Sequence, residues 1–430
     1  MKNLFLHKKK YSKYQHQLSQ VPTTLKQSFR LSLSQLPIAA AVAMAMGFRP
    51  EVGLIGLLLS VLSGAIFGIN RMGYSLALVP ILAGFFATEV TGANPFRDSD
   101  YTIWVAAALI SGLLVLLFSI FDLKKFFDGL PATFKTGFSI VVVISIWGLI
   151  LNPILGISSF ESSAFFSTGW IAHLYKAVHQ IHKVNDWSVY ITAVTVFAAM
   201  ALSNFRTLIP ASFGGMIAGT VLSLTILGEK NIVTWGEVWG NTVSLLPVFF
   251  EPMSLEWNFH QITQLVYLSC SITVVALFEL NASNSNIPRG AFTGMGFTQI
   301  LSPIIGGGPV SGIMNSDSIK IKEGVATPVL LVSKLVFTTV VAVLVAPYLI
   351  HVPVAVFAGL LLFVSIQVLR TVKWRTVWKS DNRDKIRLGV LIMVGVFVNI
   401  VIGLITTFTV HHIMKAYSKR KAKRAALLTT

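Results

Sequence analysis

One carboxylate inside an apolar stretch is the first residue in this sequence whose type and position could do chemistry. Glu279 lies near the end of the run SCSITVVALFEL, residues 269–280. An ionisable side chain in such a run is costly to bury and is usually retained for a function. There it can carry a proton or pair with a cation. The alternative is that Glu279 stands at the edge of the apolar layer and is hydrated.

A second chemical feature is the glycine-rich stretch GGGPVSGIMNSDS at residues 306–318. Its three glycines and proline predict a broken helix, with a short new helix beginning near Val310 or Ser311. The first N–H groups of a helix lack partners and carry partial positive charge, so they can hold an anion. A turn used only for close packing is the alternative. The candidate ligands in this stretch are Ser311, Gly312, Asn315 and Ser316.

A related interruption occurs earlier, where Tyr74 and Ser75 open an apolar segment that Pro80 breaks. Paired interrupted segments in corresponding places of two halves are typical of transporters built from inverted repeats. With seven segments per repeat, the third and tenth correspond, and their broken helices would face each other at mid-membrane. Gln35, in the first segment, supplies a polar group beside that centre.

Two further charged residues could compensate charge near this centre. Lys334 lies about two turns into the apolar run that starts at Thr327. It either extends to the membrane surface or neutralises a buried carboxylate. Asp317 is the second candidate. No cysteine or histidine spacing predicts a metal site, and we expect no cofactor.

The composition of the chain indicates that these residues lie in a membrane. The chain has 430 residues, of which 54% are hydrophobic and 12% charged, and its mean hydropathy is +0.73. A soluble domain usually has about 25% charged residues, so this chain cannot cover a water-exposed surface. The net charge of +17 would suggest nucleic acid in a soluble protein. Here the basic clusters flank apolar spans, as cytoplasmic segments do, which argues against nucleic-acid binding.

The apolar runs predict an all-α membrane protein with about fourteen segments. An even number places both termini on one side, and the excess of Lys and Arg in alternate loops indicates the cytoplasm of an inner or plasma membrane. Segments 1–30 and 418–430 are expected to be basic cytoplasmic ends that can bind anionic lipid. Residues 371–387 are expected to form a helix at the inner headgroup level. The expected spans are 31–47, 52–68, 74–90, 102–121, 133–155, 189–205, 208–227, 261–280, 291–304, 310–318, 327–349, 354–369, 388–404 and 405–417.

Several motifs resemble the sulfate permease (SulP) family of anion transporters. The strongest similarity is residues 306–328, which follow the family's G-G-x-P-V-[ST]-G run and its later T-P without a gap. Shorter similarities lie at residues 34–40, 48–54, 209–210 and 353–355. The resemblance covers nearly the whole membrane region, 31–417.

This resemblance implies a seven-plus-seven inverted repeat with the core and gate domains of the uracil-permease-like fold. The core would comprise 31–121 and 261–349, and the gate 133–227 and 354–417. A small anion such as sulfate or bicarbonate would bind between half-helices three and ten. By their positions in the family motifs, Gln35, Ser311, Asn315 and Ser316 become candidates for the anion site. Tyr74 and Ser75 are weaker candidates, because the third segment follows the family motif less closely. Glu279 would couple transport to a proton or sodium.

The sequence also departs from the family pattern. Ser316 stands where the family motif has a basic residue, and Asp317 follows it. This departure keeps open an alternative, a permease for a neutral or weakly acidic molecule such as a nucleobase. The family's cytoplasmic STAS domain is not expected after the last span. An enzyme is not expected, because no span offers a nucleophile and base pair. The oligomeric state stays open, with a homodimer among the alternatives.

Overall fold

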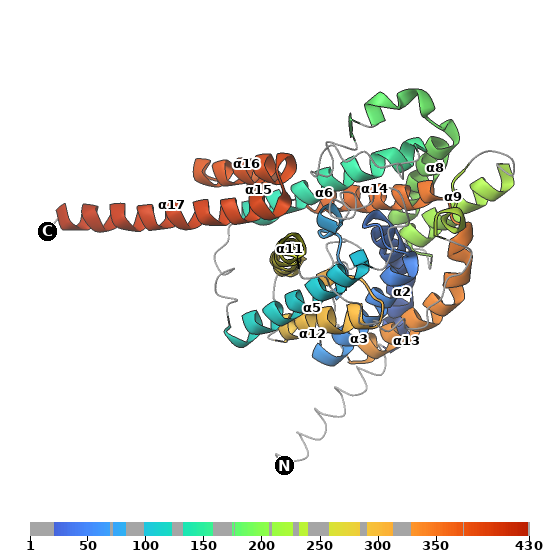
Figure 1. Cartoon of the computed structure of the whole chain (residues 1–430), viewed down its shortest axis with the longest axis horizontal. Coiled ribbons are helices and arrows are strands. Elements are labelled where there is room, and N and C mark those ends of the chain that lie inside the picture. Colours follow the sequence, from blue (N-terminus) through green and yellow to red (C-terminus); the bar gives the residue numbers. More distant parts are fainter. Residues whose placement is uncertain are drawn as a thin grey trace, which may run out of the picture.

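A computed structural model describes most of the chain. The described residues are 21–68, 72–82, 99–122, 132–157, 174–175, 177–205, 209–226, 232–239, 258–283, 290–312, 328–372 and 374–428. They form helices together with one two-stranded antiparallel sheet. The helical expectation is therefore confirmed for the described residues, and Figure 1 shows the helices gathered into one bundle from which α17 projects.

The principal helices are long and apolar. They are α2 (Val21–Ala45), α3 (Pro50–Phe67), α5 (Ser99–Ile120), α6 (Ala132–Leu155), α8 (Asp186–Asn204), α9 (Ala211–Ile226), α11 (Phe259–Ser283), α12 (Ala291–Ile304), α13 (Pro328–Val345), α14 (Val354–Thr371), α16 (Asn382–Phe397) and α17 (Ile400–Leu428). Short elements are α10 (Trp235–Trp239), α15 (Trp374–Trp378) and the 3-10 turns η2 (Ile181–Lys183) and η4 (Ala346–His351). The strands are β1 (Met72–Tyr74) and β2 (Val310–Gly312).

Among the described residues, eight helices are long and apolar enough to cross a membrane. Helix α13 shows how such a helix meets lipid. Val332, Val336 and Val340 follow one another at intervals of four residues and are 50–56% exposed. Lys334 and Thr338, on the other face, are buried. A water-soluble helix would place its apolar stripe inward, so this outward stripe fits a lipid solvent.

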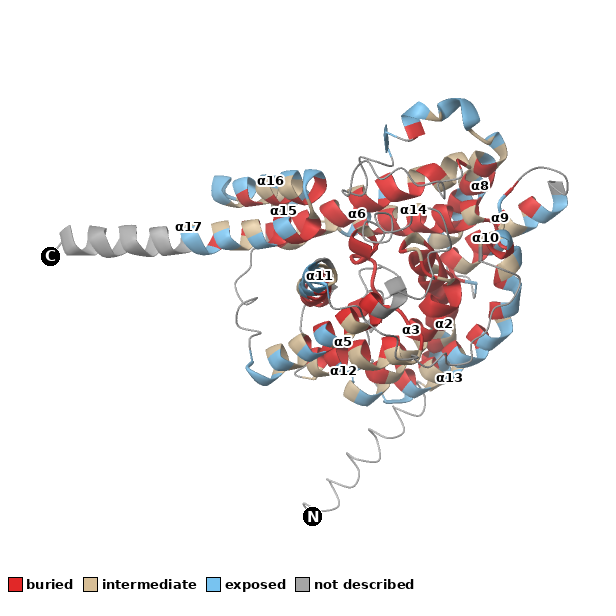
Figure 2. Ribbon diagram, viewed as in Figure 1, coloured by how far each residue is buried: buried red, intermediate tan, exposed pale blue. Residues whose placement is uncertain are grey.

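The helices pack in two groups (Figures 1 and 2). Helices α2, α3, α5, α11, α12 and α13 form one group, and α6, α8, α9, α14, α16 and α17 form the other. Contacts between the groups run mainly from α2 to α14 and α9, with a smaller contact between α11 and α17. Gly53 permits the closest approach in the first group, because a Cβ atom there would lie 2.3 Å from the Ala39 carbonyl oxygen.

The first helix begins earlier than the sequence predicts. Its expected start was residue 31, whereas α2 begins at Val21, inside the segment expected to be a cytoplasmic end. Tertiary contacts extend it. Ser28 Oγ lies 2.7 Å from Ser333 Oγ, and Thr338 Oγ1 donates to Ser32 Oγ at 2.9 Å. These partners lie about three hundred residues away, so no local pattern could reveal them.

The C-terminal boundaries also differ from expectation. Residues 371–387 do not form one surface helix, since α15 ends at Trp378 and α16 begins at Asn382. The following break lies at Val398 and Asn399 and not near residue 404. Asn399 accounts for the position of this break, because its side-chain oxygen accepts the Val401 N–H at 2.8 Å and caps the start of α17.

Candidate functional site

Two segments far apart in the sequence cross as strands in the middle of the bundle. Strand β1 pairs antiparallel with β2, and Gly73 lies opposite Ser311. Beyond the ladder, the Ser75 N–H donates to the Pro309 carbonyl oxygen at 3.2 Å. The sequence predicted helices beginning near residues 74 and 310, which is wrong for both. Each segment is extended first, because the glycines there let two backbones meet and satisfy each other's hydrogen bonds.

Tyr74 shows how closely these backbones approach. A Cβ atom on Gly308 would lie 1.8 Å from the Tyr74 hydroxyl oxygen, and one on Gly56 would lie 2.8 Å from its ring. The Tyr74 side chain therefore fills space that any residue larger than glycine would need. Gly308 is also held from α3, because its N–H donates to the Val52 carbonyl oxygen at 3.1 Å.

Glu279 is the centre of the hydrogen bonds around this crossing. It lies on α11 and is completely buried. Its Oε2 accepts the Ser75 hydroxyl at 2.6 Å, and its Oε1 accepts the backbone N–H groups of Leu76 and Ala77 at 3.1 and 3.2 Å. The alternative of a hydrated carboxylate at the edge of the apolar layer does not fit, because the side chain is completely buried and accepts three donors of the protein.

The turn after β1 directs its N–H groups inward before helical structure resumes at Val79. Besides the two that bind Glu279, the Leu78 N–H donates to Ser75 Oγ at 3.3 Å and the Val79 N–H to the Leu76 carbonyl at 3.3 Å. In this conformation the N–H groups of residues 76–79 all have acceptors, and two of them bind the Glu279 carboxylate.

Ser311 brings the tenth segment to the same carboxylate. Its hydroxyl donates to the Ala276 carbonyl oxygen at 3.0 Å and lies beside the Glu279 carboxyl group. Gly312 pairs with Met72 in the ladder. Ser75, Ser311 and Glu279 are therefore brought together as expected. The other predicted residues of this segment, Asn315, Ser316 and Asp317, lie outside the described residues.

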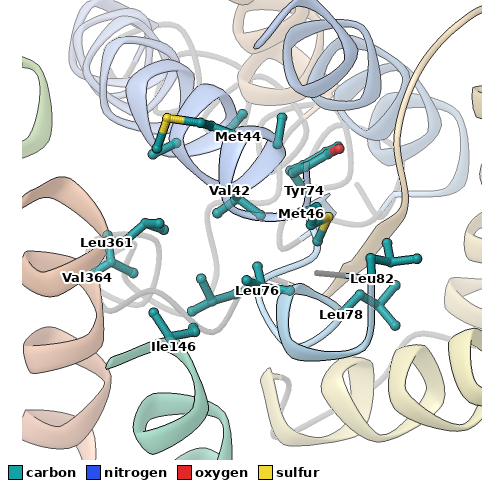
Figure 3. Packing of buried hydrophobic residues seen from close by; sticks show 14 of the residues in the cluster. Val42, Met44, Met46, Tyr74, Leu76, Leu78, Leu82, Ile146, Leu361 and Val364 are labelled. Atoms are coloured by element: carbon teal, nitrogen blue, oxygen red, sulfur yellow. The ribbon is translucent and has the colours of Figure 1, made fainter. Parts of the chain in front are cut away.

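Apolar side chains from the other helix group face the same turn. In Figure 3, Leu361 and Val364 of α14 and Ile146 of α6 point toward the turn that carries Leu76. All four belong to one buried cluster. An apolar wall of this kind strengthens electrostatic interactions beside it, because it excludes water.

Comparison with known proteins identifies the family. Residues 30–394 match the sulfate permease family. The chain belongs to this family. Together with its apolar helices, this makes the permease an integral membrane protein and places it among transporters, not enzymes.

Two curated relatives of the permease carry substrate names. YvdB of Bacillus subtilis, named as a sulfate transporter, is 23% identical over 387 residues, which covers 86% of this chain and 69% of YvdB. The bicarbonate transporter BicA of Synechocystis sp. is 23% identical over 313 residues, which covers 72% of this chain and 53% of BicA. The chain thus spans between about half and two thirds of these relatives' length.

Solved structures share the permease fold. The transmembrane domain of a cyanobacterial bicarbonate transporter, BicA, superimposes with a TM-score of 0.70 at 19% identity, covering 90% of this chain and 96% of that domain. SLC26A9 superimposes with a TM-score of 0.75 at 13% identity, covering 93% of this chain and 67% of that protein. At these identities the likeness concerns the fold alone.

Two other predicted residues of the permease, Gln35 and Lys334, are buried on α2 and α13. Gln35 is buried on α2, and it is not among the described donors to the Glu279 carboxylate. Lys334 is 4% exposed and lies on the face of α13 that contacts α2. Among the described residues no carboxylate forms an ion pair with Lys334.

Sequence reasoning missed several participants. The N–H groups of Leu76 and Ala77 bind Glu279 through the backbone, so their side chains carry no signal. Gln299 of α12 is also close to the crossing, since its Nε2 donates to the Val310 carbonyl oxygen at 3.1 Å. A lone glutamine in the apolar run 291–304 was a signal that could have found it. The described residues hold no group of three His, Cys, Asp or Glu side chains suited to a metal ion.

Proposed function

We propose that the protein is a secondary active transporter of a small inorganic or organic anion, such as sulfate or bicarbonate, working by alternating access. Its membership of the sulfate permease family supports anion transport. The curated relatives, one named for sulfate and one for bicarbonate, support this substrate class over the nucleobase alternative. A small anion is therefore the substrate class that we carry forward.

One observation carries the proposal: the paired strands β1 and β2 meet beside a completely buried carboxylate. The anion would bind at this crossing, between the third and tenth segments. Ser75, Ser311 and the backbone of Gly312 are the described candidates for contact with it. Asn315, Ser316, Tyr74 and Gln35 remain candidates from the sequence.

Glu279 suggests how transport is coupled. Its carboxylate accepts the Ser75 hydroxyl and the N–H groups of Leu76 and Ala77, which are donors that an anion would also use. While charged, Glu279 competes with the anion for these donors and repels it. A proton or a sodium ion would neutralise the carboxylate and make the donors available. Anion and coupling ion would therefore bind together, as symport requires.

The segments would move as two domains. We propose about fourteen segments in a seven-plus-seven inverted repeat, with half-helices following β1 and β2. The core would comprise 31–121 and 261–349 and the gate 133–227 and 354–417, a division supported by the two packing groups. Residues 21–30 would join the core, because they belong to α2. Asp317 and Lys334 remain candidates for charge compensation within the core.

The surroundings of the protein follow from its charge pattern. We propose an inner or plasma membrane location with both termini in the cytoplasm, where the basic residues that precede α2 and those of 418–430 contact anionic lipid. A homodimer is the assembly we would test first.

Transport can be tested in proteoliposomes that contain the purified protein. Uptake of labelled sulfate and of labelled bicarbonate would be measured with and without inward proton and sodium gradients, and labelled uracil would serve as the third substrate. We expect saturable uptake of at least one anion and none of uracil. Absence of any anion flux, while a reconstituted known transporter is active, would refute the proposal, and uracil uptake alone would reinstate the alternative.

A further inference from the structure

A chain of buried polar side chains runs behind the strand crossing. Thr273 Oγ1 of α11 donates to Ser111 Oγ of α5 at 3.0 Å, and Ser111 Oγ donates to Gln299 Oε1 of α12 at 2.9 Å. Gln299 Nε2 then donates to the Val310 carbonyl oxygen in β2 at 3.1 Å. All three side chains are buried. The chain thus links three helices to the strand that carries Ser311.

Gln299 accepts with one side-chain atom and donates with another, so both ends of its amide are used. Its side-chain oxygen accepts a hydrogen bond from the Ser111 hydroxyl, and its amide nitrogen donates one to the Val310 carbonyl oxygen. A methionine of similar length would offer neither bond. A glutamate would direct a second acceptor at the Val310 carbonyl. An asparagine is shorter by one methylene, about 1.5 Å, and could not reach both partners.

Helix α12 also binds the backbone just before β2, through Ser302, which lies one turn after Gln299 on the helix. Ser302 Oγ donates to the Gly308 carbonyl oxygen at 2.6 Å, and the Gly307 N–H donates to the Ser302 carbonyl at 2.7 Å. Residues 299 and 302 therefore lie on one face of α12, and both form hydrogen bonds with the backbone just before Ser311. The strand cannot slide along α12 without breaking these bonds.

The hydrogen bonds return to the helix from which they started. Ser311 Oγ donates to the Ala276 carbonyl oxygen of α11, one turn beyond Thr273 and one turn before Glu279. The circuit runs from α11 through α5, α12 and β2 and back to α11. A closed circuit of this kind determines where Ser311 lies relative to the Glu279 carboxylate.

From this circuit we propose that Gln299 is a positioning and selectivity residue for anion transport. It acts indirectly, because its hydrogen bond to β2 determines the position of Ser311. The inference rests on the proposed function. Gln299 itself touches neither Ser311 nor Glu279 by a hydrogen bond among the described residues. Its loss should therefore change how well the site fits one anion compared with another, and should leave the folded bundle in place.

The test uses the full-length protein with Gln299→Met, and Thr298→Val as the matched control. Thr298 is the neighbouring buried residue of α12, and its hydroxyl donates only within the helix, to the Gly294 carbonyl at 2.6 Å. KM and maximal rate are measured in proteoliposomes for sulfate and for bicarbonate. We expect Gln299→Met to raise the KM of the preferred anion about five- to tenfold and to change the ratio of the two KM values, as one misplaced hydrogen bond would. Thr298→Val should leave both unchanged.

A second variant covers the case in which Gln299→Met does not fold. Ser111→Ala removes only the bond to Gln299 Oε1 and the acceptor for Thr273, and it should change the same KM ratio in the same direction by about threefold. Unchanged KM values and an unchanged ratio in a folded Gln299→Met or Ser111→Ala protein would overturn the inference. Failure of the wild-type protein to transport any anion would instead overturn the proposed function.

Discussion

Replacing Glu279 by glutamine separates anion transport from its coupling. The Glu279→Gln side chain would keep its size and one carbonyl oxygen for the N–H groups of Leu76 and Ala77, while Ser75 Oγ could accept from the new amide nitrogen. The hydrogen-bonding geometry is therefore preserved and the negative charge is removed. The variant imitates permanently the neutralised state that a proton or sodium ion would produce transiently.

The size of the effect follows from the three hydrogen bonds. A bond to a charged group contributes about 1 kcal/mol more than a bond between neutral groups. Three such bonds hold the Glu279 carboxylate. Neutralisation therefore weakens its hold on these donors by about 3 kcal/mol, a factor of about 100 in competition with an anion. Stability should change less, because the glutamine no longer buries a charge.

Gradient-driven uptake and anion exchange are both measured in proteoliposomes. Wild-type protein should accumulate anion when a proton or sodium gradient is applied. Glu279→Gln should lose this accumulation and retain exchange of labelled for unlabelled anion. Glu51→Gln is the matched control, because Glu51 is a second buried carboxylate, paired with Arg49 at 2.6 Å. Its gradient response should persist. Full gradient-driven accumulation by Glu279→Gln would refute the coupling role of Glu279.

Three further substitutions, and one control, test packing at the strand crossing and between α2 and α13, each by thermal unfolding in detergent. Gly308→Ala should destabilise the fold by about 2 kcal/mol or more, since the new Cβ would lie 1.8 Å from the Tyr74 hydroxyl. Its control is Gly389→Ala, which should be neutral or stabilising because no atom lies within 4 Å of the new Cβ. Equal effects of the two substitutions would contradict this. Ser32→Ala should cost about 1 kcal/mol, because it removes the hydroxyl that bonds to Thr338 Oγ1 and to the Lys334 carbonyl oxygen of α13, although Thr338 keeps its own bond to that carbonyl. An unchanged unfolding temperature would show that the contact between α2 and α13 does not depend on Ser32. Lys334→Met should be neutral or stabilising, because the described residues provide no carboxylate partner for this buried cation. A large loss of stability or of transport in Lys334→Met would instead assign the lysine a role.

Much of the architecture could be predicted from local sequence. Apart from the third and tenth segments, every expected span overlaps a helix of the structure. Apolar length alone predicts such helices, because backbone in lipid must satisfy its own hydrogen bonds. The prediction fails where partners are distant. Residues 21–30 are already helical, and Ser28 among them meets Ser333 of α13; no pattern near residue 28 reveals that contact.

The candidate site shows the same division. The sequence singled out Glu279, because a carboxylate in an apolar run is costly, and the glycine stretch, because helices break there. It could not show that residues 310–312 of this stretch form a strand. That strand exists only because Gly73 and Ser311 lie opposite each other across the ladder.

Residue types alone therefore determined that this is a membrane protein with broken segments and an intramembrane carboxylate. Only the tertiary structure decided which donors that carboxylate meets. The N–H groups of Leu76 and Ala77 belong to the backbone and are the same for any residue except proline, so their use by Glu279 leaves no trace in the side chains. Their place depends on the β1–β2 crossing and on the helices that hold it, and these are brought together by folding across more than two hundred residues of chain.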